Sequence, residues 1–309
     1  MNAPLFYSKI LLFGEYGIIK NSKGLSIPYN FYSGGLKIGD ITKNSVKKSN
    51  EILAGFADFL VKIEKSLVEF DQKKIQNDLA NGMYFDSTIP QGYGVGSSGA
   101  LVAAFYDRYA KTKITVLENL TKDKLIILKK IFSQMEAYFH GESSGLDPLN
   151  SYLSLPILIQ SKNKIKTIGI PSQTKSGKGA VFLIDSGESS QTAPMIEIFF
   201  NSMKNKKFNR IMREEFIKIS DSCVENFLEA NFKALFIDIK KLSSVVFKNF
   251  KPMIPSDFHE IWKKGIETND YFLKLCGSGG GGYILGFTWD IEKTKSVLKG
   301  FKLEVVYNF

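Results

Sequence analysis

A glycine-rich segment from Pro90 to Leu101, PQGYGVGSSGAL, constrains the fold more than any other part of this sequence. The preceding stretch GMYFDSTIP predicts a strand that ends at a proline, and SSGALVAAFYDRYA predicts a helix that starts directly from the loop. A strand, a glycine loop and a helix in this order expose backbone N–H groups beside the positive end of a helix dipole. The segment therefore predicts a phosphate-binding site.

The same loop contains the G-x-G-x-x-G pattern of dinucleotide-binding turns, and Glu118 follows it at about the spacing of an acidic ribose ligand. Two features count against this alternative. Pro90-Gln91-Gly92-Tyr93 separates the strand from the pattern's first glycine, and the hydroxyls of Ser97 and Ser98 suit a metal–phosphate complex. No H-R-D or D-F-G triplet and no G-K-[ST] sequence occurs, which excludes protein kinases and Walker-type loops. An enzyme that binds a nicotinamide cofactor stays open as an alternative.

The composition is that of a globular protein, with 44% hydrophobic and 23% charged residues. Although the net charge is +10, only three of the 41 basic residues are arginines, which fork onto phosphates and base edges. We therefore expect no nucleic-acid partner. Because no apolar stretch reaches membrane length and only two cysteines are present, we expect a cytoplasmic protein without a membrane partner. The sequence leaves a homodimer open.

Strands and helices are mixed without a steady βαβ alternation, which favours an α+β fold. We expect two domains, residues 1–187 and 188–309, with three or four helices over about 193–268. A helix over 49–70 would begin at Ser49 or Asn50 as its cap. The other expected elements are strands within 6–13, 82–90, 151–171, 179–187, 271–277, 282–287 and 301–309, and helices over 97–110 and 121–139.

Two carboxylates lie in MEAYFHGESSGLDPLNSYL, which follows the second of these helices. Glu136 and His140 are four residues apart and so share a helix face, and Asp147 follows in a tight S-G-x-D turn. Near a phosphate-binding site, one carboxylate can bind Mg²⁺ while the other contacts the hydroxyl group that attacks the phosphate. We expect His140 to act instead as a cation at the helix C-terminus.

Two further stretches belong with these motifs. Lys9 ends a strand shortly before the Gly14-Glu15 turn, where its charge can face a site. In KLCGSGGGGYILGF, every residue from Gly277 to Gly282 except Ser278 is glycine. So many glycines between two strands indicate a loop that something must approach closely, such as an anion or a substrate.

Together these stretches resemble the GHMP family of small-molecule kinases. PQGYGVGSSGAL is similar to the family's phosphate loop, P-x-x-x-G-L-G-S-S-A-A, and KLCGSGGGGYILGF to its C-terminal glycine motif, K-L-T-G-A-G-G-G-G. Within the family, ILLFGEYGII and FHGESSGLD are most similar to the motifs I-L-x-G-E-H-A-V-V and I-H-G-x-P-S-G-I-D of members that phosphorylate mevalonate. The resemblance implies a two-domain α+β fold with the active site in the cleft between the domains.

The resemblance also implies cofactors and roles for individual residues. ATP and Mg²⁺ would be the cofactors, with Lys9 and Asp147 as catalytic residues and Ser98 and Glu136 as Mg²⁺ ligands. The implied nucleotide contacts come from one loop, Gly92, Gly94, Val95, Gly96, Ser97, Ser98 and Gly99. The implied substrate contacts are Glu15, Tyr16, Thr192, Gly277, Ser278, Gly279 and Gly280.

The chain departs from the family's motifs at several positions. Tyr16 replaces the histidine of G-E-H, Gln191 replaces a basic residue before the threonine, Ser143 replaces a proline, and Gly99 replaces an alanine. Most of these changes affect the acceptor side. We therefore expect a kinase for mevalonate or a similar anionic alcohol, with phosphomevalonate, homoserine or a sugar as alternative acceptors. A nucleotide or metabolite sensor with the same fold is the alternative from a different class.

Overall fold

The computed structural model describes residues 4–116, 120–161, 164–174 and 176–309, and these form two compact units. Unit 1 consists of Met1–Lys9, Ile27–Pro90 and Gly96–Leu155, and unit 2 of Ile10–Ser26, Gln91–Val95 and Pro156–Phe309. Glu118 of the dinucleotide-binding alternative lies outside the described residues. Strands β1 (Phe6–Phe13) and β2 (Gly24–Ile38) contribute residues to both units.

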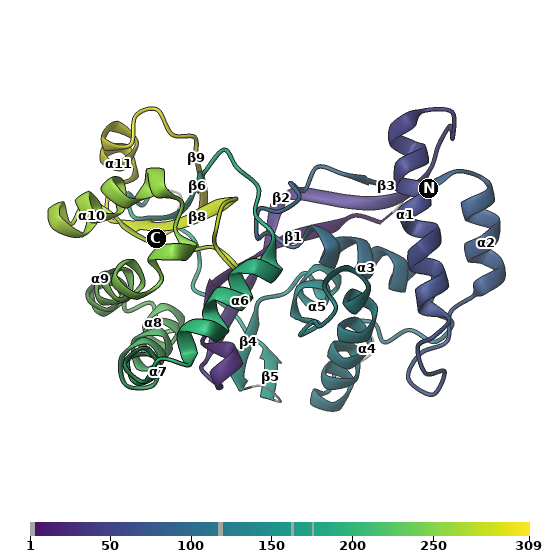
Figure 1. The fold of residues 1–309 in the computed structure, drawn as a ribbon, viewed down its shortest axis with the longest axis horizontal. Helices are drawn as coiled ribbons and strands as arrows, with labels where there is room; N and C mark the ends of the chain where they lie inside the picture. The colour runs from purple at the N-terminus through teal and green to yellow at the C-terminus, as the bar shows by residue number, and fades with distance from the viewer. Residues whose placement is uncertain (1–3, 117–119, 162–163, 175) are drawn as a thin grey trace. The chain divides into compact units, whose positions relative to one another are not determined.

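Unit 1 pairs the end of β2 with β3 and packs helices beside them. The two strands are antiparallel, with Gly34 opposite Ser87 and Ile38 opposite Met83. Helix α1 packs against β3, while α3, α4 and α5 pack against one another (Figure 1). The elements that lie wholly in unit 1 are α1 (Asn44–Leu60), α2 (Gln72–Ala80), β3 (Met83–Ser87), α3 (Ser97–Tyr109), α4 (Lys122–His140) and α5 (Leu146–Leu153).

Helix α1 begins earlier than the sequence suggested, with Lys43 as its N-cap, and it ends at Leu60 instead of near residue 70. Ser49 and Asn50, the two expected caps, lie inside the helix and form hydrogen bonds with β3 instead. Ser49 Oγ accepts a hydrogen bond from the backbone N–H of Phe85 at 2.9 Å, and Asn50 Nδ2 donates to the carbonyl of Met83 at 2.8 Å. The cap prediction was therefore wrong, because these polar side chains satisfy backbone groups of a neighbouring strand.

The connection from α4 to α5 positions the second carboxylate. Gly141 follows the last residue of α4, as expected, and Gly145 is the N-cap of α5 with a left-handed backbone, φ +71°. Asp147 lies in the first turn of α5, so the expected tight turn is in fact the start of a helix. At Gly99 of α3, an added Cβ would come within 2.7 Å of the carbonyl carbon of Asp147. Glycine at this position therefore lets α3 and α5 approach closely.

Unit 2 contains an antiparallel four-stranded sheet in the order β7-β8-β6-β9, with α9 and α10 packed against β7. The start of β2 pairs with β4 in the same unit. The strands and 3-10 segments are η1 (Ile18–Lys20), β4 (Ile157–Ser161), β5 (Lys164–Thr167), β6 (Ala180–Asp185), η3 (Lys251–Met253), η4 (Ser256–Phe258), β7 (Phe272–Leu275), β8 (Tyr283–Thr288) and β9 (Leu303–Asn308). The helices are α6 (Thr192–Met203), α7 (Lys206–Ile211), the π-helical η2 (Met212–Phe216), α8 (Ile217–Leu228), α9 (Phe232–Asn249), α10 (His259–Thr268) and α11 (Ile291–Val297).

Two features of unit 2 differ from expectation. The helical region over about 193–268 contains five α-helices, α6 to α10, instead of three or four, because the π-helical η2 separates α7 from α8. The expected domain boundary near residue 187 falls inside unit 2. Strand β6 lies between β8 and β9 in the sheet, and the whole segment from Pro156 to Phe309 belongs to unit 2. None of the helices in the described part of the chain is long and apolar enough to cross a membrane.

Substitution of Gly145 by alanine tests the α4–α5 connection. A Cβ at Gly145 would lie 2.2 Å from the carbonyl oxygen of Lys129 and 2.6 Å from the backbone nitrogen of Ser133. We expect Gly145→Ala to lower the free energy of unfolding by about 3 kcal/mol, from the left-handed backbone and the clash together. Urea unfolding followed by circular dichroism measures the change.

Gly187→Ala is the matched control, because Gly187 has a similar φ of +78° and no described atom lies within 4 Å of an added Cβ. It should cost only about 1–2 kcal/mol, the backbone contribution alone. Equal losses in the two variants would show that the contact with α4 adds nothing.

Candidate functional site

A lysine and an aspartate form an ion pair in unit 1. Lys9 on β1 places its Nζ 3.0 Å from Oδ1 of Asp147, in the first turn of α5. The two side chains differ in exposure, 6% for Lys9 and 39% for Asp147. The pair therefore presents a carboxylate to solvent while a buried ammonium lies beside it. A carboxylate held in this way can accept a proton or orient a hydroxyl group.

A serine and a glutamate form a second pair in the same unit. Ser98, in the first turn of α3, donates its hydroxyl to Oε1 of Glu136 on α4 at 3.0 Å. Burial, and next the negative charge of Asp147, raise the pKa of Glu136 to about 7, against the opposing effects of Ser143, Ser98 and Lys9. The four predicted residues Lys9, Ser98, Glu136 and Asp147 are thus brought together in one cluster.

Two residues that were not predicted as site residues also contact this cluster. Nε2 of His140 lies 3.0 Å from the hydroxyl oxygen of Ser98. Our expectation of a helix-terminal cation does not account for this contact, although the four-residue spacing from Glu136 already placed both side chains on one face. Ser143 donates its hydroxyl to Oε2 of Glu136. Sequence analysis noted Ser143 only as a departure from a motif.

The glycine loop divides between the two units. Gly96 is the N-cap of α3 with φ +83°, and Ser97 begins the helix, so the first N–H groups of α3 lack partners inside the helix. These residues and Gly99 belong to unit 1, whereas Gly92, Gly94 and Val95 belong to unit 2. The backbone carbonyl of Gly92 accepts a hydrogen bond from the backbone N–H of Ser190 at 2.9 Å. The predicted nucleotide contacts of this loop stay predictions.

Glu15 and Tyr16, the first two predicted substrate contacts, are buried in unit 2. Nζ of Lys274 lies 2.5 Å from Oε1 of Glu15, and the side chains are only 3% and 6% exposed. Tyr16 donates its hydroxyl to the carbonyl of Ser278 at 2.6 Å and packs its ring against Phe199. Burial and the charge of Glu15 raise the pKa of Tyr16. This geometry favours a structural role for both residues over the predicted substrate contacts.

The C-terminal glycine run is anchored by its own hydrogen bonds in unit 2. Gly280 donates its N–H to the carbonyl of Met253 at 2.7 Å, and Gly282 donates to the carbonyl of Glu188 at 2.5 Å. These two N–H groups are therefore engaged within the protein. Of the remaining predicted substrate contacts, Gly277, Ser278 and Gly279 lie in this run, and Thr192 is exposed at the first position of α6.

The oxygen donors of unit 1 fit a magnesium ion that is bound together with phosphates. Mg²⁺ prefers oxygen ligands and usually takes one or two carboxylates in addition to substrate phosphates. The Ser98 hydroxyl and the Glu136 carboxylate are in contact and supply such oxygens. Among the described residues, no group of three or more His, Cys, Asp or Glu side chains is placed so that it could hold a metal ion by itself.

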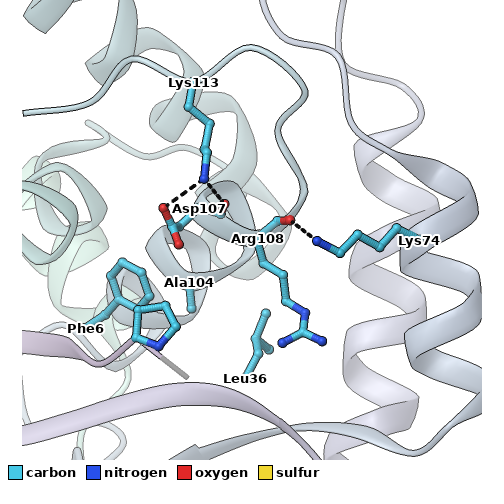
Figure 2. Close-up of a pocket in the computed structure, with 8 residues that line it drawn as sticks. Phe6, Leu36, Lys74, Ala104, Asp107, Arg108 and Lys113 are labelled. Atoms are coloured by element: carbon cyan, nitrogen blue, oxygen red, sulfur yellow. Dashed lines mark hydrogen bonds and ion pairs between the residues drawn. The ribbon is translucent and has the colours of Figure 1, made fainter. Parts of the chain in front are cut away.

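A cavity of about 270 Å³ lies elsewhere in unit 1, lined by Phe6, Leu36 and Ala104 together with charged side chains (Figure 2). Its basic groups are already engaged. Figure 2 shows Nζ of Lys74 at the backbone carbonyl of Arg108 and Nζ of Lys113 at Asp107, and the Arg108 guanidinium pairs with Asp78. None of the predicted site residues lines this cavity.

The raised pKa of Glu136 predicts how stability depends on pH. The group titrates near pH 7 in the folded chain and near 4.5 when unfolded, so the folded state binds more protons between these values. Stability conferred by the protonated form is complete below about pH 4.5 and is lost as the pH rises through 7. In metal-free buffer, we expect Glu136→Gln to be more stable than the parent at pH 8, by about 1–3 kcal/mol, and similar at pH 4.

Urea unfolding at the two pH values measures this difference. The control is Glu142→Gln, because Glu142 is an exposed carboxylate in the loop after α4. This variant should have nearly the stability of the parent at either pH. A Glu136→Gln variant that is less stable than the parent at pH 8 would contradict the assignment of a buried carboxylate with a raised pKa.

The chain is similar to known kinases in part of its sequence and in its fold. Residues 60–154 match the family model of the GHMP kinases N terminal domain. No curated protein sequence matches the chain. Among solved structures, an L. major mevalonate kinase in complex with R-mevalonate superposes with a TM-score of 0.67 at 16% identity, covering 100% of this chain and 96% of the other.

Two further similar structures are of kinases that are named for other substrates. A Streptococcus pneumoniae phosphomevalonate kinase in complex with phosphomevalonate and AMPPNP has a TM-score of 0.64 at 13% identity, covering 99% of this chain and 100% of the other. A Lactococcus lactis galactokinase complexed with galactose has a TM-score of 0.64 at 11% identity, covering 98% and 93%. Residues 60–154 thus match the GHMP kinase N-terminal domain model, and the chain has the α+β fold of the GHMP kinases, in agreement with the resemblance found in its motifs.

Proposed function

We propose that this protein is an ATP-dependent kinase that transfers the γ-phosphoryl group of Mg·ATP to the primary hydroxyl of mevalonate. The observation that carries the proposal is the cluster in unit 1, where the Lys9–Asp147 pair lies beside the Ser98–Glu136 pair. Phosphoryl transfer needs positioned groups and neutralised charge more than covalent catalysis, and this cluster supplies both.

The Lys9–Asp147 pair would act on the acceptor. The half-exposed carboxylate of Asp147 can accept the proton of the attacking hydroxyl or hold that hydroxyl in line. The buried ammonium of Lys9, at 3.0 Å from the carboxylate, would lower the pKa of the hydroxyl and balance the negative charge that develops during attack. A purely nucleotide-binding sensor would need neither group.

The Ser98–Glu136 pair would hold Mg²⁺ through the Ser98 hydroxyl oxygen and the Glu136 carboxylate. When bound, the ion would neutralise charge on the β- and γ-phosphates. The N–H groups at the start of α3 would bind phosphate oxygens, with the glycine loop from Gly92 to Gly96 leading into them.

Support for mevalonate as the acceptor comes from the segment FHGESSGLD and from the mevalonate kinase among the similar structures. Phosphomevalonate kinase and galactokinase have similar scores, so sister acceptors are the competing proposal. The engagement of Glu15 and Tyr16 inside unit 2 leaves Thr192, Gly277, Ser278 and the rest of the glycine run as the proposed acceptor contacts from that unit.

The first experiment measures ADP release from Mg·ATP by the purified protein. One reaction contains no acceptor, and the others contain mevalonate, phosphomevalonate, homoserine or galactose. We expect release that depends on mevalonate. Release with a different acceptor would keep the kinase proposal and replace its substrate. Nucleotide binding without release on any acceptor would favour the sensor, and binding of a nicotinamide cofactor would favour the dinucleotide alternative.

Substitution of Asp147 tests the mechanism. We expect Asp147→Asn to lower turnover about 100-fold or more while ATP binding, measured by calorimetry, stays within a few-fold of the parent. Asp86→Asn is the matched control, since Asp86 also pairs with a lysine of unit 1, Lys37, but both partners are about half exposed and lie outside the cluster. Exposed ion pairs contribute little, so this variant should keep its activity. Normal turnover in Asp147→Asn would remove Asp147 from the mechanism.

A further inference from the structure

Both carboxylate oxygens of Glu136 accept hydrogen bonds from serine hydroxyls. Ser98 donates to Oε1 from α3, and Ser143 donates to Oε2 from the loop that follows α4. The carboxylate is buried, with Glu136 only 4% exposed. Two donors on opposite oxygens fix the rotation of a carboxylate about its last side-chain bond. Ser143 and Ser98 together therefore determine which lone pairs of the Glu136 carboxylate stay available to a further ligand.

Ser143 is itself held in place by its neighbours. Its hydroxyl oxygen accepts a hydrogen bond from the backbone N–H of Gly145 at 3.0 Å, and its carbonyl accepts one from the hydroxyl of Ser133 at 2.5 Å. A serine hydroxyl has one proton, and here that proton is donated to Glu136 while the oxygen accepts from Gly145. The donor is thus oriented before any ligand binds.

From these contacts we propose that Ser143 is a positioning residue, which holds the Glu136 carboxylate in the orientation that receives the divalent ion of the metal–nucleotide complex. The inference rests on the proposed function and deepens it. The GHMP motif that the segment resembles has proline at this position, and proline has no side-chain donor. The serine therefore gives this chain a contact to Glu136 that the motif does not provide.

Loss of the Ser143 hydroxyl would leave Oε2 of a buried carboxylate without its donor. The carboxylate could then rotate or take up a proton, and either change would weaken its bond to a metal ion. Substitution of residues that orient metal ligands typically costs 10-fold to 100-fold in metal affinity. The effect should appear as weaker divalent-ion binding, while the acceptor side at Lys9 and Asp147 keeps its geometry.

The test compares Ser143→Ala with Ser143→Thr and with Ser144→Ala. Thr retains a hydroxyl at the same position. Ser144 is the adjacent, exposed serine, and its hydroxyl accepts a hydrogen bond from the backbone N–H of Leu146 at 3.3 Å. The hydroxyl donors to Glu136 come from Ser98 and Ser143, so Ser144→Ala removes a neighbouring hydroxyl and leaves both of these contacts in place. Circular dichroism confirms that each variant is folded. The main readout is the dissociation constant of Mn²⁺ with AMPPNP present, measured by electron paramagnetic resonance without acceptor or turnover.

We expect Ser143→Ala to weaken Mn²⁺ binding about 10-fold or more, with recovery in Ser143→Thr and no change in Ser144→Ala. Parallel assays should show a raised Mg²⁺ requirement and an unchanged KM for the acceptor. Parent-like Mn²⁺ binding in Ser143→Ala would overturn the positioning role and leave the kinase proposal intact. Loss of binding in Ser143→Thr and Ser144→Ala as well would assign the effect to the loop backbone and also overturn it.

A second measurement separates failure of this inference from failure of the proposed function. If the parent binds no Mn²⁺ with AMPPNP, the proposed function fails, and the metal role of Ser143 fails with it. The contact itself is still tested by urea unfolding of Ser143→Ala, Glu136→Gln and the double variant. Additive changes in the unfolding midpoint would show that Ser143 does not act on Glu136, whereas non-additive changes would show that it does.

Discussion

Glu136 keeps its carboxylate inside unit 1, where the negative charge of Asp147 acts on it. Burial of a charged group away from water is costly unless hydrogen bonds and opposite charges compensate for it. Here the compensation comes from three separate parts of the chain, Ser98 on α3, Ser143 after α4 and Lys9 on β1. The elements of unit 1 must therefore converge on this point, and the raised pKa shows that the compensation is incomplete.

Two departures from the GHMP motifs have a structural reason in this convergence. Gly99 replaces an alanine where α3 meets the start of α5, and a Cβ there would lie 2.7 Å from the carbonyl carbon of Asp147. Ser143 replaces a proline where the loop reaches Glu136. The first change brings the backbone of α5 close to α3, and the second adds a donor to the buried carboxylate. Both act on groups that surround the proposed reaction centre.

The two buried lysines of the predicted motifs differ in a way that separates chemistry from structure. Lys274 pairs with Glu15 in unit 2, and both side chains are almost fully buried. Lys9 pairs with Asp147 in unit 1, and the aspartate is 39% exposed. A pair that is buried on both sides stabilises its own surroundings and cannot reach a ligand without breaking. A pair with one exposed member can act on a substrate, so only the second is proposed as catalytic.

Local features of the sequence determined much of this protein. Glycine conformations, the strand–loop–helix order and helix periodicity depend on neighbouring residues, so they predicted α3, α4, the glycine loop and the α+β class before any contact was known. The resemblance of the motifs to those of the GHMP kinases also selected Lys9, Ser98, Glu136 and Asp147, which the structure brings together. Tertiary structure alone decided which side chains partner one another. Glu15 meets Lys274 across 259 residues, and Ser49 and Asn50 bond to β3 instead of capping α1. Ser143 likewise turns its hydroxyl to Glu136 because the loop after α4 folds back onto that helix. Such pairings depend on where distant backbone segments pack, and no local preference encodes that position.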